Sequence, residues 1–363
     1  MSSTTTTSSQ AAWRRLRKNK GAIAGLIVIS LAVLVAVFAY FIAPDNSPYA
    51  NRMILEIGGE KPGTTRQFLQ VKKETGFAAE GFFTQLLNGK QDKYYYVPIT
   101  SHTLNGDNVI VQKYIDEGLT ERQAYHQTQV AATPVTSITF WLGTDKYGRD
   151  ILSRLIIGTR ISLSVGLIAV VISISIGLVL GSLAGYIRGR TDSAIMWFIN
   201  VIWSIPTLLL VFAITLALGK GFWQVFIAVG LTMWVNVARL VRGQVLAVRE
   251  MEYIEATRAL GFSGARTIVR HIWPNIIGPV VVIAASNFAS AIVIEAGLSF
   301  LGVGVQPPQP SWGLMIKENY NFIITNNPML ALAPGFAIMI LVLAFNLLGN
   351  GLRDAMNVRG KTG

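Results

Sequence analysis

Long uninterrupted runs of apolar residues dominate this sequence, and they limit the folds that it can adopt. The first run covers residues 21–43, and five more cover approximately residues 161–186, 194–218, 222–241, 276–303 and 329–349. A run of this length can cross a bilayer as a helix. Because the runs are continuous and do not alternate as barrel strands do, helices are the spanning structure that they predict. We therefore predict an all-α integral membrane protein with six transmembrane helices.

The composition and the start of the chain agree with this prediction. Of the 363 residues, 52% are hydrophobic and only 14% are charged, which is more apolar than an ordinary soluble domain. Five basic residues precede the first run, as in a signal peptide, but the run is too long and lacks a small-residue cleavage site. We interpret residues 1–20 as a basic cytosolic N-terminus and residues 21–43 as an uncleaved first transmembrane helix.

The distribution of basic residues predicts the orientation. Residues 239–271 contain six arginines and three glutamates, whereas residues 44–154 contain twelve basic and twelve acidic residues. Since cytoplasmic loops carry the excess of Lys and Arg, both termini and the loop at 242–275 are expected in the cytosol. The net charge of +12 is then a topological signal. It does not indicate nucleic-acid binding, because no basic patch is interleaved with exposed aromatic residues.

Residues 44–140 are polar and are predicted to form an extracytoplasmic insert domain between the first two helices. Asn105-Gly106 is typical of a turn; residues 94–97 are expected to be a strand and residues 117–130 to have helical character. His102 and His126 are isolated, so we predict neither a catalytic nor a metal site there, and the absence of cysteine excludes disulfides. Residues 141–350 are predicted to form a core with the other five helices, followed by a cytosolic tail at 351–363.

The loop between the fourth and fifth runs is unusually polar. Residues 252–261 have a helix-forming composition, Gly261 suits a left-handed cap, and Ser263 can begin a second helix. Pro274 is expected to mark the turn into the fifth helix. Small residues such as Ala256 and Gly261 favour close approach to a partner protein, whereas a helix lying in the membrane interface prefers bulky apolar residues.

Two motifs are expected on the opposite side of the membrane. In the first, Asp145 is a natural N-cap for the following helix. In the second, three prolines in four residues exclude a regular helix, and Trp312 can anchor at the interface; this loop is expected to contact a delivered substrate or its carrier. The candidate residues of the two motifs are Asp145, Gly148, Arg149, Asp150, Gln306, Pro307, Pro308 and Trp312.

Glu295 is the only acidic residue deep inside a predicted span. A carboxylate at mid-membrane costs about 3 kcal/mol on insertion scales, so such residues usually face a bundle interior or water. The functional interpretations are a polar gate contact or a proton site, and the structural one is a hydrogen bond near the outer end of the fifth helix. We favour the structural interpretation, because a single acid makes a poor proton relay.

Several segments, in order and correctly spaced, resemble the second permease subunit of dipeptide and oligopeptide ABC importers. The closest resemblance covers residues 141–359 and rests on five segments: residues 142–155, which begin Leu142-Gly-Thr-Asp-Lys-Tyr-Gly-Arg-Asp150, residues 158–163, residues 255–261 with 270–275, Glu295 to Pro308, and Phe345 to Asp354. It implies the type I ABC importer permease fold. In that family a Glu-Ala-Ala loop docks into a groove of the ATPase. The matching residues here are Glu255, Ala256, Thr257, Gly261 and Pro274, with Thr257 in place of the second alanine. The insert at 44–140 is longer than is usual in the family.

The resemblance also implies the partners. A homologous permease would complete a heterodimer in the bacterial inner membrane, two ATPase subunits would bind ATP and Mg, and an extracytoplasmic binding protein would deliver the substrate. The chain has no phosphate loop of its own, since Gly219-Lys220 is followed by Gly221. We therefore predict a transport subunit that is not an enzyme and holds no cofactor or metal.

The substrate and the transport class leave alternatives. Family membership favours di- or oligopeptides over nickel, glutathione or oligosaccharides. A partner-free secondary transporter using Glu295 is the main rival, but it predicts paired halves with broken helices, and the spans show no evident repeat. A membrane enzyme would need a cluster of catalytic side chains, and a receptor built on the insert would leave the polar loop unexplained.

Overall fold

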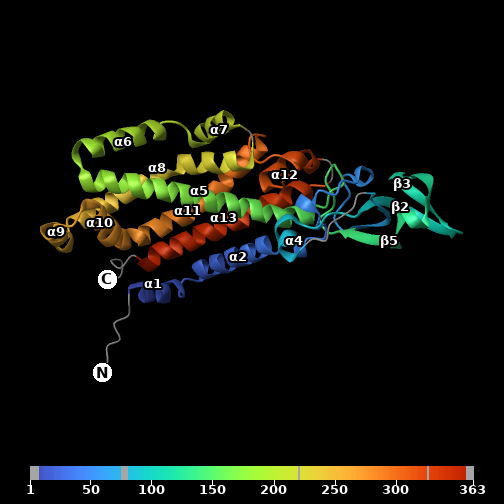
Figure 1. Ribbon diagram of the computed structural model, residues 1–363, viewed down its shortest axis with the longest axis horizontal. Helices are drawn as coiled ribbons and strands as arrows, with labels where there is room; N and C mark the ends of the chain where they lie inside the picture. The colour runs from blue at the N-terminus through green and yellow to red at the C-terminus, as the bar shows by residue number, and fades with distance from the viewer. Residues whose placement is uncertain (1–7, 75–80, 220, 325–326, 357–363) are drawn as a thin grey trace, which may run out of the picture. The chain divides into compact units, whose positions relative to one another are not determined.

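The structure is a computed structural model that describes residues 8–74, 81–219, 221–324 and 327–356. The chain forms two compact units (Figure 1). The first comprises Met1–Ala32, Ser162–Gln306 and Ile338–Gly363, and the second comprises Val33–Ile161 and Pro307–Ala337. Three long helices, α2, α5 and α13, each contribute residues to both units.

In the described residues, five helices are long and apolar enough to cross a membrane. A sixth span results if the bent pair α6 (Gly189–Trp203) and α7 (Thr207–Leu218) is counted as one. The prediction of six helices is therefore confirmed as five or six candidate spans. The five are α2 (Lys20–Val37), α5 (Ile151–Ile187), α8 (Phe222–Arg249), the helical run Gly264–Phe300 and α13 (Met329–Met356).

The break between α6 and α7 differs from the continuous third helix that we predicted. The two helices meet at 91°, and Pro206 stands immediately before α7. Proline cannot donate a backbone hydrogen bond and its ring clashes with the preceding turn, which ends a helix. The apolar pattern continues across the break, so hydropathy alone did not reveal it.

The turn expected at Pro274 is also absent from the structure. Here α10 (Gly264–Thr267), the π-helical turn η4 (Ile268–Ile272) and α11 (Trp273–Phe300) follow one another as one helical run. Pro274 lies directly after the π-helical turn η4, where the hydrogen-bond pattern of the run changes and a residue without a backbone N–H can be accommodated. The prediction of a turn there was wrong.

The first unit is held together by close packing of α5, α8 and α11. Val237, Val241 and Val245 of α8 are fully buried against Ile276 and Val280 of the helical run. On α5, a Cβ added to Gly181 would lie 2.5 Å from the carbonyl oxygen of Ala238. Such a contact leaves no room for a side chain, so the two helices approach each other at glycine.

The second unit contains a five-stranded antiparallel sheet with strand order β4-β3-β2-β1-β5. The chain is therefore not all-α as predicted. The strands are β1 (Thr64–Lys72), β2 (Tyr94–Asn105), β3 (Asn108–Asp116), β4 (Leu119–His126) and β5 (Val130–Phe140). The predicted strand at 94–97 and the Asn105-Gly106 turn are confirmed. The helical character expected at 117–130 was wrong, because pairing of β4 with β3 overrides local helix propensity.

Each face of the sheet has its own core. Phe68 and Leu69 are consecutive in β1 and therefore point to opposite faces. Phe68 packs with Ile54 and Phe140, whereas Leu69 belongs to a separate cluster with Val109. The chain enters the sheet and leaves it at adjacent positions, because the backbone N–H of Gly63, just before β1, donates to the carbonyl oxygen of Phe140 at the end of β5, at 2.8 Å.

The remaining described elements are short. They are α1 (Ser8–Leu16), α3 (Ala39–Ile42), α4 (Phe82–Asn88), α9 (Glu252–Ala259), α12 (Trp312–Asn319), η1 (Pro48–Ala50), η2 (Leu55–Ile57), η3 (Gln127–Gln129) and η5 (Tyr320–Ile323). The helices α9, α10 and α1 and the C-terminal end of α13 lie at the same end of the first unit (Figure 1). This end carries the polar loop that the sequence singled out.

Candidate functional site

The short helix α9 is the centre of the polar loop. Ile254 is fully buried in the cluster formed by α8 and α11, so it fastens α9 to the first unit. Glu255 and Ala256 are exposed on the surface. Tyr253 and Leu260 also remain exposed, at 45% and 72%. The helix thus has one anchored face and one free face that is partly apolar.

Gly261 ends α9 in the conformation that the sequence predicted. Its φ is +75°, in the left-handed region that favours glycine. The backbone N–H of Gly261 donates to the carbonyl oxygen of Arg258, and that of Phe262 donates to Thr257. These two bonds define a Schellman cap. No atom lies within 4 Å of a Cβ added at Gly261, so the surface around it is open.

Thr257, which replaces the second alanine of the family pattern, lies on the anchored face of α9. It is 6% exposed, and its Oγ1 donates to the carbonyl oxygen of Ile254 at 2.7 Å. Oγ1 also lies 3.4 Å from the hydroxyl of Thr267 in α10. The hydroxyl is therefore satisfied inside the loop, and the substitution leaves the free face unchanged. Pro274, beyond this loop, is exposed.

The first of the two motifs predicted to face outward forms a buried ionic network in the second unit. Asp145 accepts hydrogen bonds from the backbone N–H of Tyr147 and from Arg149, which also pairs with Glu318 of α12 at 2.8 Å. The Arg149 side chain is 1% exposed. Gly148, with φ +73°, is required because a Cβ there would overlap the carbonyl oxygen of Ile54. These residues join the loop to α12.

The residue that caps α5 is Asp150, and the prediction that Asp145 does so was wrong. Asp150 Oδ2 accepts the backbone N–H of Ser153 at 2.8 Å and also its hydroxyl. Asp145 lies five residues away and is folded back onto its own loop. Burial raises the pKa of Asp150, and the hydrogen bonds from Ser153 oppose that rise.

Replacing Arg149 with methionine should destabilise the protein by about 3 kcal/mol, because it leaves buried carboxylates without their main partner. The measurement is thermal unfolding of the purified chain in detergent. Lys317→Gln removes an exposed cation beside Glu318 and should leave the unfolding temperature nearly unchanged. Equal effects of the two substitutions would contradict a structural role for the network.

The second of the motifs predicted to face outward is only partly exposed. Pro307 and Pro308 are exposed, and Gln306 Nε2 donates to the carbonyl oxygen of Gly304 at 2.8 Å. Trp312 is 3% exposed, and its indole N–H donates to the carbonyl oxygen of Leu155 at 3.0 Å. The interpretation of Trp312 as an interfacial anchor was therefore wrong, because its ring fills space above Gly158 of α5.

Glu295 is fully buried and forms a local hydrogen-bonded chain in the first unit. The hydroxyl of Ser299 donates to Glu295 Oε1 at 2.6 Å. The same Ser299 oxygen accepts a hydrogen bond from the backbone N–H of Val305 at 3.0 Å. These bonds tie the end of α11 to the segment after it. The geometry agrees with the structural interpretation of this carboxyl group.

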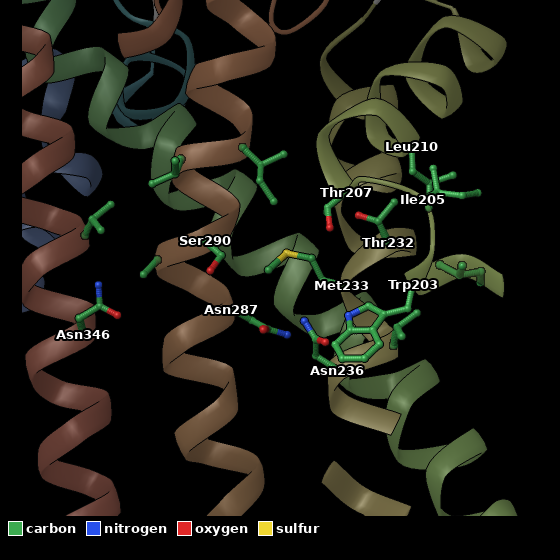
Figure 2. Close-up of a pocket in the computed structure, with 16 residues that line it drawn as sticks. Trp203, Ile205, Thr207, Leu210, Thr232, Met233, Asn236, Asn287, Ser290 and Asn346 are labelled. Atoms are coloured by element: carbon green, nitrogen blue, oxygen red, sulfur yellow. The ribbon is translucent and has the colours of Figure 1, made fainter. Parts of the chain in front are cut away.

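A polar cavity in the first unit was not predicted from the sequence. Its volume is about 430 Å³. In Figure 2, Asn236 of α8 and Asn287 and Ser290 of α11 point into the same space. The other lining residues are Ile202, Trp203, Ile205, Thr207, Leu210, Thr232, Met233, Val235, Ala289, Val293, Ile294, Val342 and Asn346.

The cavity opens on a face where polar groups lie at mid-helix. Asn236, Ser290 and Asn346 are exposed and stand near the middle of α8, α11 and α13. Exposed apolar neighbours such as Leu343 (55%) suit lipid, whereas an exposed amide in hydrocarbon is unfavourable. The sequence feature that could have indicated this cavity is a set of side-chain amides within the apolar runs. It was missed because their common face depends on how three helices pack.

Comparison with known proteins now identifies the chain. The family described as "Binding-protein-dependent transport system inner membrane component" matches residues 177–359. The chain belongs to this family. A second family, the "N-terminal TM domain of oligopeptide transport permease C", matches residues 7–55. The resemblance inferred from the motifs is thereby confirmed: the chain is the permease subunit of an ABC importer.

Curated relatives of the permease agree with this assignment. It is 42% identical over 222 residues to the glutathione transport system permease protein GsiD of Pectobacterium atrosepticum, covering 61% of this chain and 73% of that one. It is 40% identical over 217 residues to the oligopeptide transport system permease protein OppC of Bacillus subtilis, covering 60% and 71%. Among solved structures, it is similar to the inward-facing MetNI methionine ABC transporter, with 19% identity and a TM-score of 0.47 over 56% of this chain and 97% of that one.

Proposed function

We propose that this permease imports short peptides through a pathway formed with a second, homologous permease of the type I importer fold. Relatives of this permease are named for the transport of glutathione and oligopeptides, and a further relative, 40% identical, for the transport of dipeptides; glutathione is itself a tripeptide. The observation that carries the proposal is the face of exposed amides at mid-helix around the cavity. A pathway between two permeases gives these amides water or substrate in place of lipid.

The chemistry of the cavity suits peptides of varied sequence. Asn236, Asn287 and Asn346 supply both donors and acceptors, which match the amide groups that all peptides share. None of the described residues that line the cavity is charged. A neutral lining does not select for one side-chain charge, so we expect the extracytoplasmic binding protein to set much of the selectivity.

The free face of α9 is the proposed contact with the ATPase subunits. Its exposed Tyr253 and Leu260 give a partner apolar surface, and its buried Ile254 fixes α9 to the helices that form the cavity. Movement imposed on α9 can therefore reach the bundle, which would alternate between two packings. Docking to cytoplasmic ATPases requires a topology in which α9 and both termini lie in the cytoplasm and the sheet lies outside. The ATPase subunits would bind ATP and Mg.

The broken α6–α7 span is a feature that a secondary transporter would share, but the family match to ABC importer permeases outweighs it. Glu295 is not among the residues that line the cavity, and its contact with Ser299 gives it a structural role. The same machinery could carry nickel or oligosaccharides, but an amide-rich cavity is a better match for peptides.

Single-cysteine labelling tests the pathway directly, because the chain contains no cysteine. In the assembled importer, Asn236→Cys, Ser290→Cys and Asn346→Cys should react with a small, water-soluble maleimide, and transported peptide should slow the reaction. Leu343→Cys, also exposed on α13, should react poorly because lipid covers it. If all four positions react equally, or if peptide has no effect, the face is not the pathway.

A further inference from the structure

An apolar groove lies on the first unit between α5 and the turns that precede α11. Its volume is about 270 Å³. Val179, Ile187 and Val269 are about half exposed, so the groove is open along its length. The apolar lining comprises Val179, Leu183, Ile187, Ala265, Ile268 and Val269. An occupant must therefore be largely hydrocarbon.

Two of the three polar side chains in the groove walls are already paired with each other. Trp273 Nε1 donates to the hydroxyl of Ser182 at 2.9 Å. A polar ligand would have to break this bond or leave its own groups unpaired, which is unfavourable in an apolar site. The remaining polar lining residue is Tyr186, at which the character of the surface changes.

Positive charge gathers around Tyr186. The guanidinium carbons of Arg258 and Arg249 lie 5.3 Å and 5.7 Å from the centre of its ring. Arg188, which lies between α5 and α6, pairs with Glu250. These four charged residues form what we call the arginine cluster, which holds three cations and one carboxylate.

Arg249 is the member of the cluster that most needs an anion. Its Nε and Nη1 have no hydrogen-bond acceptor among the described residues, and the residue as a whole is only partly buried, so an anion can approach it. Leaving such donors of a charged group unpaired is unfavourable. The structure therefore places an unsatisfied guanidinium beside one end of a hydrocarbon groove.

We propose that this site binds an anionic glycerophospholipid, with one acyl chain in the groove and the phosphate against Arg249 and Arg258. The acyl chain of such a lipid suits the apolar groove and its phosphate suits the arginine cluster, whereas a soluble phosphate would interact with the arginine cluster alone. The proposal rests on the topology proposed above, in which this end of the bundle meets the cytoplasmic leaflet, where anionic lipids attract basic residues.

A bound lipid would also connect the moving parts of the permease. Arg258 belongs to α9, whereas Tyr186 belongs to α5, and the phosphate would bridge the arginines that stack on this tyrosine. The lipid would thus stabilise the position of α9 against α5 on the side that faces the membrane. The free face of α9 would remain available to a partner.

Native mass spectrometry of the purified chain can measure this binding. In detergent with equal amounts of phosphatidylglycerol and phosphatidylcholine, the chain should retain the anionic lipid roughly tenfold more. The double variant Arg249→Gln/Arg258→Gln should lose this preference, and Arg249→Lys/Arg258→Lys should keep most of it. Ala265→Trp should fill the groove and reduce the retention of both lipids.

Matched controls separate the site from general effects. Arg353→Gln removes an exposed arginine outside the cluster, and Ala194→Trp adds the same bulk on α6 outside the groove; neither should change lipid retention. Equal retention of the two lipids by the unmodified chain, or an equal loss of preference in Arg353→Gln, would overturn the proposal. Displacement by millimolar glycerol 3-phosphate would also overturn it, since the ligand would then be a soluble anion. The assay uses neither substrate nor ATP, so its failure leaves the proposed transport function untouched.

Discussion

Replacing Gly261 with tryptophan should reduce peptide uptake by about tenfold or more while the permease still inserts and folds. The left-handed backbone at Gly261 costs a side-chain-bearing residue about 1–2 kcal/mol. The indole would also project into open space beside the free face of α9. Both effects act where the ATPase is proposed to dock, so uptake and peptide-stimulated ATP hydrolysis should fall together in the reconstituted importer.

Two control variants separate backbone strain from loss of docking. Gly261→Asn should retain most activity, because asparagine tolerates the left-handed conformation and adds little bulk. Gly189→Trp places the same ring outside α9, at another glycine that has a positive φ of +58° and open surroundings. It should therefore leave uptake nearly normal. Normal uptake by Gly261→Trp would remove the main support for docking at α9.

The double substitution Asn236→Leu/Asn346→Leu should reduce peptide uptake by roughly 10- to 100-fold. Each change removes an amide from the cavity, and loss of hydrogen bonds to a substrate in a desolvated site costs about 1–3 kcal/mol. The variant should insert as well as the unmodified chain, because leucine is favourable in a membrane helix. Uptake of a labelled peptide into proteoliposomes that contain the full importer is the measurement.

The matched control for the cavity is Leu343→Asn, which adds an amide to α13 outside the set of lining residues. It should lower the yield of inserted protein more than it lowers uptake per inserted molecule. If the double leucine variant transports at the normal rate, the cavity is a packing defect and the proposed pathway lies elsewhere.

The features that the sequence predicted correctly are those set by local chemistry. Membrane helices follow from uninterrupted apolar runs, and the left-handed cap follows from glycine after a helix-forming segment. Gly261 has the predicted conformation and Ser263 accepts from the backbone N–H of Arg266, as an N-cap does. These properties depend on a few neighbouring residues, which a single sequence shows directly.

The features that were missed depend on contacts between distant residues. The strand β4 contains residues with helix propensity, but pairing with β3 decides its conformation. Arg149 was predicted only as part of an extracytoplasmic loop motif, and the sequence did not show that it is buried and paired with Glu318, 169 residues away, as well as with Asp145. Likewise, no single one of Asn236, Ser290 and Asn346 indicates a site in the sequence. They form one only because the packing of α8, α11 and α13 brings them to a common face.

The single point of entry and exit of the sheet has an evolutionary consequence. Gly63 and Phe140 are joined by a backbone hydrogen bond, so everything between them departs from and returns to the same position. A lineage could gain, enlarge or discard such a module without changing the path of the flanking chain. Natural selection could therefore alter the surface that the sheet presents while the membrane helices stayed under separate constraint.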